Sequence, residues 1–356
     1  MKIFYIARDS GLENTGASMV VRRNLSGLKE LVGSDNVVEY RLPKVNLKNV
    51  VYSLIRCGSY GITAKEERKI IDAVRQVSPD FIFIESSSYG SLVKKMSKLG
   101  YRTMCFAHNL DTKLYKQEIS SRNPLFSIPK YFLTWINEKK TTKYSDTIIC
   151  LNVRDSNDFG KMFGRYADMI LPITFPMRNV CNEESRNYAT VKPYYLFVGS
   201  DFFPNVEGIK WFVNNVAGHV DVDIHVVGGC CNNSVLKKLS LPENVSFLGY
   251  VDDLDREYYG ASGVIAPIFK GSGMKTKTIE AMSYGKSIFG TNEAFAGIEC
   301  DYTKIGGLCN TADEFIECIN KSNKGVFNDY TYRLFKDEYS DIKFLNMLRT
   351  FILHKE

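Results

Sequence analysis

Short apolar runs alternate with amphipathic stretches along the first half of the chain. The run Asp80–Glu85 is apolar on both faces, as in a buried strand, and Lys65–Gln76 has the apolar spacing of a helix. This alternation predicts a parallel sheet with helices on both faces. The expected strands are Lys2–Ala7, Val37–Arg41, Asp80–Glu85, Arg102–Ala107 and Thr147–Leu151, and the expected helices are Ala17–Val32, Lys65–Gln76 and Ser91–Leu99.

Residues 174–193 interrupt the pattern with prolines and asparagines among charges, which is typical of a linker. The alternation then restarts. We expect strands at Tyr194–Gly199, Asp223–Gly228, Val245–Phe247, Gly263–Pro267 and Ser287–Gly290, and helices at Val206–Asn215, Asp253–Ala261 and Ile342–His354. The chain therefore reads as an α/β protein with an N-terminal domain over 1–180, a second domain over 181–335, and a C-terminal helix within 336–356.

Composition fits a cytoplasmic globular protein. The chain has 356 residues, enough for two domains, and 44% of them are hydrophobic. No apolar run approaches the roughly 20 residues that span a bilayer, and the N-terminus lacks the apolar core of a signal peptide. The nine cysteines are scattered without a CxxC pair, which argues against a disulfide framework or a zinc site.

Charge is distributed unevenly. Residues 1–180 hold 28 Lys and Arg against 17 Asp and Glu, whereas the rest of the chain holds 18 against 23. The basic first half suggests an anionic partner, either a membrane face or a phosphate-bearing acceptor, although a solvated basic surface explains it equally well. No nucleic-acid-binding motif is present.

The segment with the most specific chemistry runs from Gly271 to Thr291. A strand leads into the glycine-rich turn Gly-Ser-Gly-Met-Lys, and the turn opens a helix that ends near Gly285. The first turn of a helix offers unpaired backbone amides and a positive dipole end, which favour an anion such as a diphosphate. The pattern predicts a nucleotide-diphosphate site, with Gly271, Ser272, Gly273 and Met274 in its turn and Lys275 and Lys277 supplying charge.

Each of these residues also has a simpler interpretation. Lys275 and Lys277 are two positions apart and face different sides, so we expect one of them, Lys275, to reach the phosphates, while ordinary surface lysines are the alternative. Glu280 lies among apolar residues, where a carboxylate needs partners, and ribose hydroxyls would supply them. A solvated helix glutamate is the alternative.

The second half resembles the nucleotide-sugar domain of GT-B glycosyltransferases, most closely family 4. The resemblance rests on Tyr195-Leu-Phe-Val-Gly-Ser, Pro204-Asn-Val-Glu-Gly-Ile-Lys-Trp-Phe, Phe247-Leu-Gly-Tyr-Val-Asp-Asp and the segment from Gly271 to Thr291, in that order. It implies two Rossmann-like domains facing across a cleft, with the C-terminal helix packing back on the first. It also implies a retaining, metal-independent transferase that uses a nucleotide-diphosphate sugar and no other cofactor.

The resemblance extends to the first half. Phe106-Ala-His-Asn-Leu-Asp is similar to the family's His-Asn-x-Glu segment, with Asp111 in the acidic place, which implies that His108 is an active-site group. A core histidine is the alternative. Residues Asn109, Asp111 and Glu85 are expected on the acceptor side. On the donor side the resemblance adds the loop glycines Gly16 and Gly199, Asn205, and Tyr250 beside the base, where a buried tyrosine is the alternative.

Two departures from the family pattern bear on the donor. Family members commonly carry two glutamates eight positions apart; Glu280 matches the second, but Ser272 stands in place of the first. The family's Arg and Lys pair after the first strand of this domain is also missing. Lys275, Lys277 and backbone amides would then have to balance the diphosphate charge.

We therefore expect a glycosyltransferase of surface polysaccharide synthesis that acts in the cytoplasm. Its acceptor would be a glycan on a lipid carrier, met at the inner membrane face through the basic half of the chain. A non-hydrolysing nucleotide-sugar epimerase on the same fold, and an inactive nucleotide-sugar-binding partner, are the alternatives.

Overall fold

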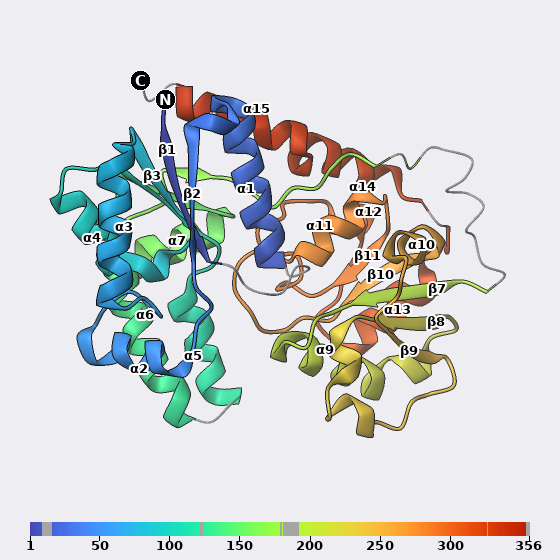
Figure 1. Cartoon of the computed structure of the whole chain (residues 1–356). Helices are drawn as coiled ribbons and strands as arrows, with labels where there is room; N and C mark the ends of the chain where they lie inside the picture. The colour runs from blue at the N-terminus through green and yellow to red at the C-terminus, as the bar shows by residue number, and fades with distance from the viewer. Residues whose placement is uncertain (9–15, 122–123, 179, 181–191, 326, 354–356) are drawn as a thin grey trace. The chain divides into compact units, whose positions relative to one another are not determined.

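The chain folds into two compact units. The computed structural model describes all residues except 9–15, 122–123, 179, 181–191, 326 and 354–356. The first unit comprises Met1–Pro172 with Leu345–Glu356, and the second is the continuous stretch Ile173–Phe344. We call them unit 1 and unit 2 (Figure 1).

Unit 1 is built on a parallel six-stranded sheet in the order β2-β1-β3-β4-β5-β6. The strands are β1 (Ile3–Arg8), β2 (Val37–Leu42), β3 (Phe81–Ile84), β4 (Thr103–Ala107), β5 (Thr147–Cys150) and β6 (Met169–Ile170). In the register, Ile3 pairs with Val37 on one side and Phe81 on the other. Strands β3, β4 and β5 are buried throughout, as the continuous apolar runs of parallel strands require.

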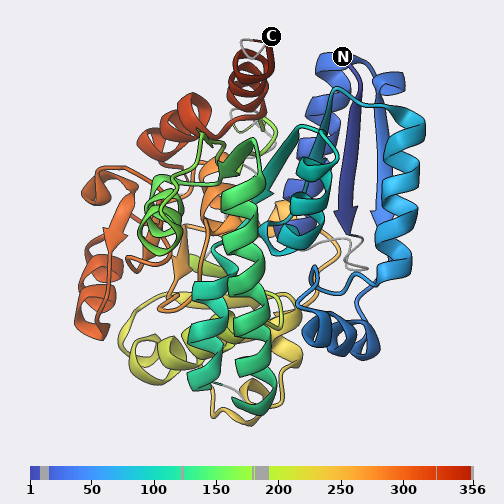
Figure 2. The same ribbon diagram turned by 90° about the vertical axis from the view of Figure 1, so that its left-hand side faces the viewer.

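Helices cover both faces of this sheet. Figure 1 shows α1 on one face and α3 and α4 on the other, and Figure 2 gives the same unit from its side. The helices are α1 (Gly16–Val32), α2 (Leu47–Arg56), α3 (Ala64–Val77), α4 (Gly90–Lys98), α5 (Asp111–Ser121), α6 (Pro124–Tyr144), α7 (Val153–Phe163) and α15 (Asp341–Leu353), of which the last enters unit 1 at Leu345. Side chains of α3 and α4, among them Ile70, Val74, Leu92 and Met96, pack against Phe4 and Ile82 of the sheet.

Unit 2 repeats the plan with a parallel six-stranded sheet in the order β12-β11-β10-β7-β8-β9. The strands are β7 (Tyr194–Val198), β8 (Asp223–Val227), β9 (Val245–Gly249), β10 (Gly263–Ala266), β11 (Ile288–Gly290) and β12 (Gly306–Leu308). The helices are α9 (Phe203–Asn215), α10 (Leu254–Gly260), α11 (Thr276–Ser283), α12 (Tyr302–Ile305), α13 (Ala312–Lys321) and α14 (Asp329–Leu334).

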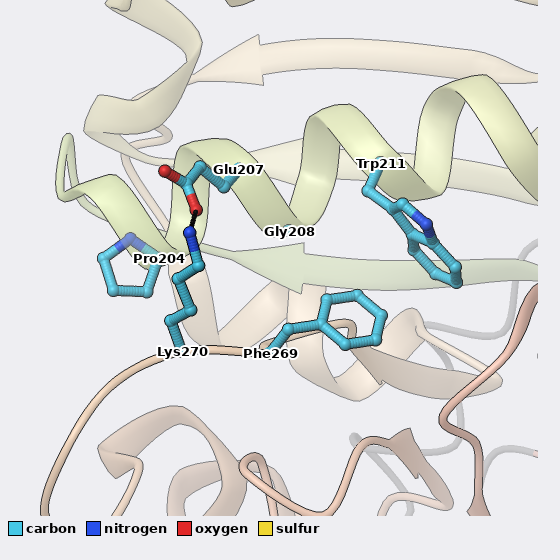
Figure 3. Close-up of a pocket in the computed structure, with 6 residues that line it drawn as sticks. All are labelled: Pro204, Glu207, Gly208, Trp211, Phe269 and Lys270. Atoms are coloured by element: carbon cyan, nitrogen blue, oxygen red, sulfur yellow. Dashed lines mark ion pairs between the residues drawn. The ribbon is translucent and has the colours of Figure 1, made fainter. Parts of the chain in front are cut away.

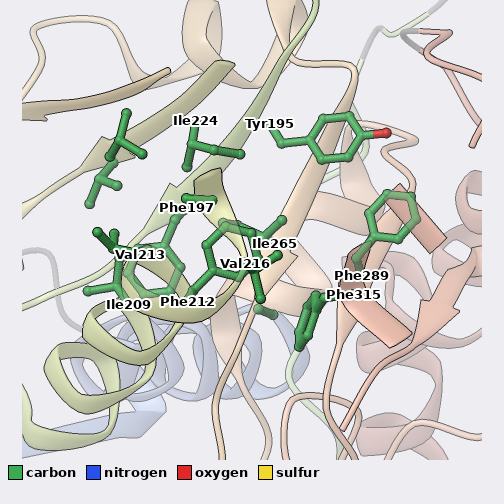
Figure 4. Packing of buried hydrophobic residues seen from close by; sticks show 14 of the residues in the cluster. Tyr195, Phe197, Ile209, Phe212, Val213, Val216, Ile224, Ile265, Phe289 and Phe315 are labelled. Carbon is green, nitrogen blue, oxygen red and sulfur yellow. The ribbon is translucent and has the colours of Figure 1, made fainter. Parts of the chain in front are cut away.

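The core of unit 2 joins the sheet to α9 and α13. Phe197 of β7 and Ile265 of β10 belong to one buried cluster with Phe212 of α9 and Phe315 of α13 (Figure 4). The rings of Phe212 and Phe315 meet edge to face at 5.5 Å between centroids. Helix α9 approaches the chain after β10 closely at Gly208, where an added Cβ would lie 2.1 Å from the carbonyl oxygen of Pro267.

The structure confirms the predicted α/β fold, with two parallel sheets. Gly16, expected in the loop after β1, is instead the first residue of α1, and the preceding loop lies outside the described residues. Most of the expected linker, residues 181–191, also lies outside them. Helices α2, α5, α6 and α7 in unit 1 were not predicted from the sequence. In unit 2, helices α12, α13 and α14 and strand β12 were not predicted either.

Candidate functional site

The expected donor residues of unit 2 gather at one edge of its sheet. Because the strands run parallel, the segments that follow their carboxyl ends lie at the same edge, where ligands bind in such folds. Gly199 follows β7, Tyr250 follows β9, and the turn from Gly271 lies between β10 and α11. A residue that we did not predict, Glu293, lies just after β11 at this edge.

The glycine-rich turn has the backbone conformation that its glycines permit. Gly271 has a φ of +143° and Gly273 a φ of +66°, a region that L side chains rarely adopt. Ser272 between them and Met274 after them are buried, with 9% and 6% of their surface exposed. The turn ends at Lys275, the N-cap of α11, and so delivers the chain to a helix N-terminus. A helix end of this kind attracts an anion.

Lys275 is held inside this turn. Its Nζ donates hydrogen bonds to the carbonyl oxygens of Ser272 at 3.3 Å and Gly273 at 3.1 Å. The same atom forms an ion pair with Oε1 of Glu293 at 2.7 Å, and both side chains are largely shielded from solvent. Lys275 thus lies at the turn with its charge balanced by the segment after β11.

Lys277 points to a different neighbour. Its Nζ donates to Oδ1 of Asn205 at 2.7 Å and lies 4.1 Å from the centroid of the Phe197 ring. Asn205, in the first turn of α9, donates in turn to the carbonyl oxygen of Ser200 at 3.0 Å. Burial lowers the pKa of Lys277 to about 7. The lysine therefore has a titratable charge close to neutral pH.

Glu280 lies on α11 within a cluster of aromatic and charged side chains. The hydroxyl of Tyr258 donates to its Oε2 at 3.2 Å, and the Tyr258 ring stacks on Tyr284 at 4.4 Å. The guanidinium of Arg178 lies 4.0 Å from the centroid of the Tyr284 ring. Burial raises the pKa of Glu280, and the positive charge of Arg178 opposes that rise. The carboxylate is thus not an ordinary solvated helix glutamate.

Tyr250 is exposed, so the alternative of a buried tyrosine is wrong. Its side chain is 78% exposed, and its hydroxyl would lie 2.7 Å from a Cβ added at Gly229. Gly228 has a φ of +105°, and a Cβ there would lie 2.5 Å from the carbonyl oxygen of Gly199. The segments after β7 and β8 therefore approach closely, with an aromatic ring open to solvent beside them.

In unit 1, His108 and Glu85 meet at the carboxyl ends of neighbouring strands. Nε2 of His108 lies 2.7 Å from Oε2 of Glu85. The other carboxylate oxygen of Glu85 accepts from the hydroxyl of Tyr5 at 2.6 Å and the amide of Asn24 at 2.9 Å. The side chain of Glu85 is 1% exposed and that of His108 15%. Glu85 is therefore arranged to orient the His108 ring, and its expected contact with an acceptor stays a prediction.

Arg23 supplies a positive charge near this carboxylate. It donates to Oδ1 of Asn24 from Nη2 at 2.7 Å, and its guanidinium lies 6.0 Å from the centroid of the Phe106 ring. Burial lowers the pKa of Arg23 to about 9, and the charge of Glu85 opposes the shift. Tyr5, Arg23 and Asn24 were not identified from the sequence. Arg23 and Asn24 lie on α1, the helix that follows the first strand.

Asp111 begins α5 and shares its N-terminus with a second buried carboxylate, Glu138 of α6. Oδ2 of Asp111 accepts from the hydroxyl of Ser88 at 2.8 Å. Glu138 accepts from the backbone amides of Asp111 at 2.9 Å and Thr112 at 3.1 Å. Burial raises the pKa of both groups, that of Glu138 to about 8. Asn109, between His108 and this pair, is half-buried.

The described residues also bear on metal binding, membrane-spanning helices and the presence of a pocket. No group of three or more His, Cys, Asp or Glu that could hold a metal ion occurs among them. Within the same residues, no helix has the length and apolar character needed to cross a bilayer. A pocket of about 180 Å³ on unit 2 is lined by Pro204, Glu207, Gly208, Trp211, Phe269 and Lys270, and an ion pair of 3.0 Å joins Lys270 to Glu207 beside it (Figure 3).

Comparison with known proteins agrees with the arrangement in unit 2. Residues 192–321 match the family model described as "Glycosyl transferases group 1". A curated relative, described as an uncharacterized 44.6 kDa protein in the cps region of Klebsiella pneumoniae, is 23% identical over 270 residues, 69% of this chain. The match spans 66% of that relative, just under two thirds of its length.

Solved structures share the fold over the whole chain. Sucrose-phosphate synthase from Thermosynechococcus elongatus has a TM-score of 0.76 at 13% identity, covering 99% of this chain and 98% of that one. HepE from Anabaena, solved in complex with UDP-glucose, has a TM-score of 0.68 at 13% identity, with 100% of both chains covered. An α,α-trehalose-phosphate synthase (UDP-forming) from Burkholderia vietnamiensis has a TM-score of 0.62 at 11% identity over 100% of this chain and 99% of that one. The chain therefore has the GT-B fold of these solved structures, and its residues 192–321 match the family model of glycosyl transferases group 1.

Proposed function

We propose that the protein is a retaining glycosyltransferase that moves a sugar from a nucleotide-diphosphate donor to an acceptor hydroxyl during synthesis of a surface polysaccharide. The group 1 match of residues 192–321 supports the reaction class. The relative in the cps region supports a polysaccharide product, and the HepE structures with UDP and UDP-glucose support a nucleotide-sugar donor.

The observation that carries the proposal is the turn from Gly271 to Lys275 at the N-terminus of α11. It combines positive φ angles at Gly271 and Gly273 with a lysine whose ammonium lies on the turn itself. Backbone amides and a fixed positive charge at a helix N-terminus are what a diphosphate needs. In the proposal the diphosphate binds this turn, and Lys275 leaves Glu293 in part to face it.

The other residues of unit 2 take roles on either side of the diphosphate. Glu280, on the same helix, accepts hydrogen bonds from the ribose hydroxyls, and Tyr258 and Arg178 hold it in place. Tyr250, being exposed, stacks on the nucleotide base. Lys277 adds charge at the phosphates through the Asn205 side, which compensates for the missing Arg and Lys pair after β7.

His108 acts in the sugar-transfer step. It contacts the donor sugar or the reacting centre and stabilises developing charge, with its ring oriented by Glu85. The reaction proceeds on one face of the sugar: the bond to the leaving phosphate breaks, the acceptor oxygen forms the new bond, and the leaving phosphate takes the acceptor proton. This scheme requires no protein nucleophile, no metal ion and no cofactor.

The acceptor is proposed to be a glycan on a lipid carrier at the inner face of the membrane. Asn109 and Asp111 lie on the side of unit 1 that would receive it, next to His108 in the chain. The basic excess of residues 1–180, with 28 Lys and Arg against 17 Asp and Glu, supports a peripheral contact with an anionic surface.

A thermal-shift screen over nucleotides and nucleotide sugars tests the donor class. A ligand at about a hundred times its dissociation constant stabilises the protein by about 2.7 kcal/mol, a readily measured shift. We expect a nucleoside diphosphate and its sugar conjugates to raise the melting temperature, and the matching monophosphate to do so much less. Stabilisation by none of them would overturn the proposal, and conversion of the donor sugar to its epimer without transfer would replace it with an epimerase.

A further inference from the structure

Helix α2 of unit 1 presents an apolar stripe to solvent. Leu47, Val51 and Ile55 are four positions apart and therefore line one face of the helix. Their exposed fractions are 70%, 46% and 79%. Ser53, on the opposite face, is buried, and Leu54, which borders the stripe, is half-buried. The helix is thus amphipathic, and much of its apolar face is exposed to solvent.

The next helix shows that this is not the rule for the unit. In α3 the exposed side chains are all polar: Lys65, Arg68, Lys69, Asp72, Arg75 and Gln76. A surface helix normally carries charged and polar residues on its outer face, and contiguous exposed apolar residues mark an interaction surface. The outer face of α2 therefore needs a partner that α3 does not.

Positive charge surrounds the stripe. Lys44 lies three positions before α2, Lys48 is in its first turn and Arg56 is its last residue, and all three are exposed. Residues 40–65 as a whole contain five Lys and Arg and no Asp or Glu. An apolar stripe with basic residues beside it and no acidic ones matches the interface of an anionic bilayer, where apolar side chains enter the acyl boundary and cations meet the headgroups.

The helix is fixed in place at both ends. Oδ1 of Asn46 caps its N-terminus by accepting from the amide of Asn49 at 2.8 Å. Nη1 of Arg8 donates to the carbonyl oxygen of Pro43 at 2.7 Å, and Nζ of Lys140 donates to that of Cys57 at 2.9 Å. These bonds hold the segment before and after α2, so the outer stripe is a stable part of the surface.

The position of α2 suits a membrane-borne acceptor. Figure 1 shows α2 beyond the carboxyl ends of the strands of unit 1, and Arg8, which anchors its approach, is the last residue of β1. Glu85 and His108 follow β3 and β4 at the same edge of the sheet. A bilayer against α2 would therefore bring lipid-linked molecules to the edge that carries these residues.

We propose that Leu47, Val51 and Ile55, with Lys44, Lys48 and Arg56, form a docking surface for an anionic lipid bilayer. The lipid-borne acceptor rests on the proposed function, but the docking surface does not, because it stands on the exposure and charge of α2 alone.

The test is flotation of the full chain with vesicles of phosphatidylcholine alone or with added phosphatidylglycerol. We expect the wild-type chain to bind the anionic vesicles, and the triple variant Leu47→Gln, Val51→Gln, Ile55→Gln to lose at least tenfold in partition. The variant Lys48→Glu, Arg56→Glu should lose binding to anionic vesicles similarly, and higher salt should weaken wild-type binding. As a matched control, Val235→Gln with Leu241→Gln removes two exposed apolar residues of unit 2 and should bind like wild type.

Nucleotide binding, measured by thermal shift on the same variants, separates this inference from the proposed function. The α2 variants should keep the wild-type response to nucleotide, because they leave the residues of unit 2 unchanged. Wild-type binding to neither vesicle, or equal binding by the triple variant, overturns the docking surface even if nucleotide binding is intact. Self-association of the wild type in sedimentation velocity that the triple variant abolishes would instead make α2 an interface between copies and also overturn it.

Discussion

His108 and Glu85 form a contact of 2.7 Å between Nε2 and Oε2 at the ends of the neighbouring strands β4 and β3. The carboxylate is nearly inaccessible to solvent and accepts hydrogen bonds from Tyr5 and Asn24, so its orientation toward the imidazole is fixed. Because Glu85 holds the His108 ring in one orientation, the role of this contact can be tested by measuring turnover in variants of the two residues.

His108→Ala should lower turnover by about a hundredfold, the scale of one lost transition-state contact, and Glu85→Gln by about tenfold. If Glu85 acts only through His108, adding Glu85→Gln to His108→Ala should cost nothing further. Steady-state kinetics on the two single variants and the double variant measure this coupling. Additive losses would show that Glu85 has a role of its own, and normal turnover by His108→Ala would remove the histidine from the mechanism.

Glu280→Gln should weaken nucleotide binding by about 1.5 to 3 kcal/mol, because a charged acceptor of ribose hydroxyl groups is lost. Isothermal titration calorimetry gives the affinity directly. Tyr258→Phe is the matched control, since it removes one hydrogen bond to the carboxylate at 3.2 Å and leaves the charge in place. It should cost less than Glu280→Gln. A folded Glu280→Gln variant with wild-type affinity would contradict the ribose contact.

Diphosphate affinity should fall as pH rises through neutrality. Burial lowers the pKa of Lys277 to about 7, so the ammonium is mostly charged at about pH 6 and mostly neutral at about pH 8. The charged form attracts the diphosphate, which makes low pH the favourable side. Affinity for nucleoside diphosphate at these two values tests the sign. Lys277→Arg, which stays charged, should flatten the dependence, whereas an equal slope in this variant would assign the titration to another group.

Lys275→Ala should weaken donor binding at every pH, because its ammonium lies on the glycine-rich turn itself. Glu293→Gln removes the ion pair of 2.7 Å without touching the lysine, and so releases Lys275 toward the donor. We expect it to keep or improve affinity, as measured by calorimetry. Loss of affinity in Glu293→Gln and no change in Lys275→Ala would reverse these roles.

Gly208→Ala should destabilise the protein by about 1 to 3 kcal/mol. Alanine ordinarily favours a helix over glycine by about 1 kcal/mol, but here the added Cβ would lie 2.1 Å from the backbone oxygen of Pro267. Gly218→Ala is the control, because a Cβ there meets nothing within 4 Å. Urea unfolding gives the free energy of unfolding of each variant, and Gly208→Ala should be the less stable of the two. Equal stability would mean that α9 shifts away from Pro267 without cost.

Much of the fold could be predicted because each strand of a buried parallel sheet is a short apolar run. Strand β3, expected at Asp80–Glu85, forms at Phe81–Ile84, and β10 and β11 lie within a residue of their expected ends. Helices α5 and α6 escaped because their apolar residues lack a clear period and Pro129 falls inside α6. Helix α2 was missed although its sequence is amphipathic, with Leu47, Val51 and Ile55 on one face and Asn49, Ser53 and Arg56 on the other.

The candidate site, like the fold, could be predicted only in part. A turn such as Gly271–Lys275 carries its own local signal, since glycine spacing and a following helix are visible in the sequence. The partners of its side chains are not local: Glu280 meets Tyr258 from another helix, and Asp111 meets Glu138 from 27 positions further along. Of the site residues that were not identified from the sequence, only Glu293 could have been found, because it follows a strand at the edge where the turn was expected. The functional roles themselves stay predictions.

Unit 2 is one uninterrupted stretch of chain, while unit 1 is made of two pieces that flank it. During synthesis the ribosome therefore completes residues 173–344 before the last piece of unit 1 exists. All six strands of the unit 1 sheet are made before unit 2, and only the last part of α15, from Leu345, joins unit 1 afterwards. The sheet of unit 1 can therefore form first, in the usual order from the N-terminus, but unit 1 lacks its last helical segment until the whole of unit 2 has been synthesised.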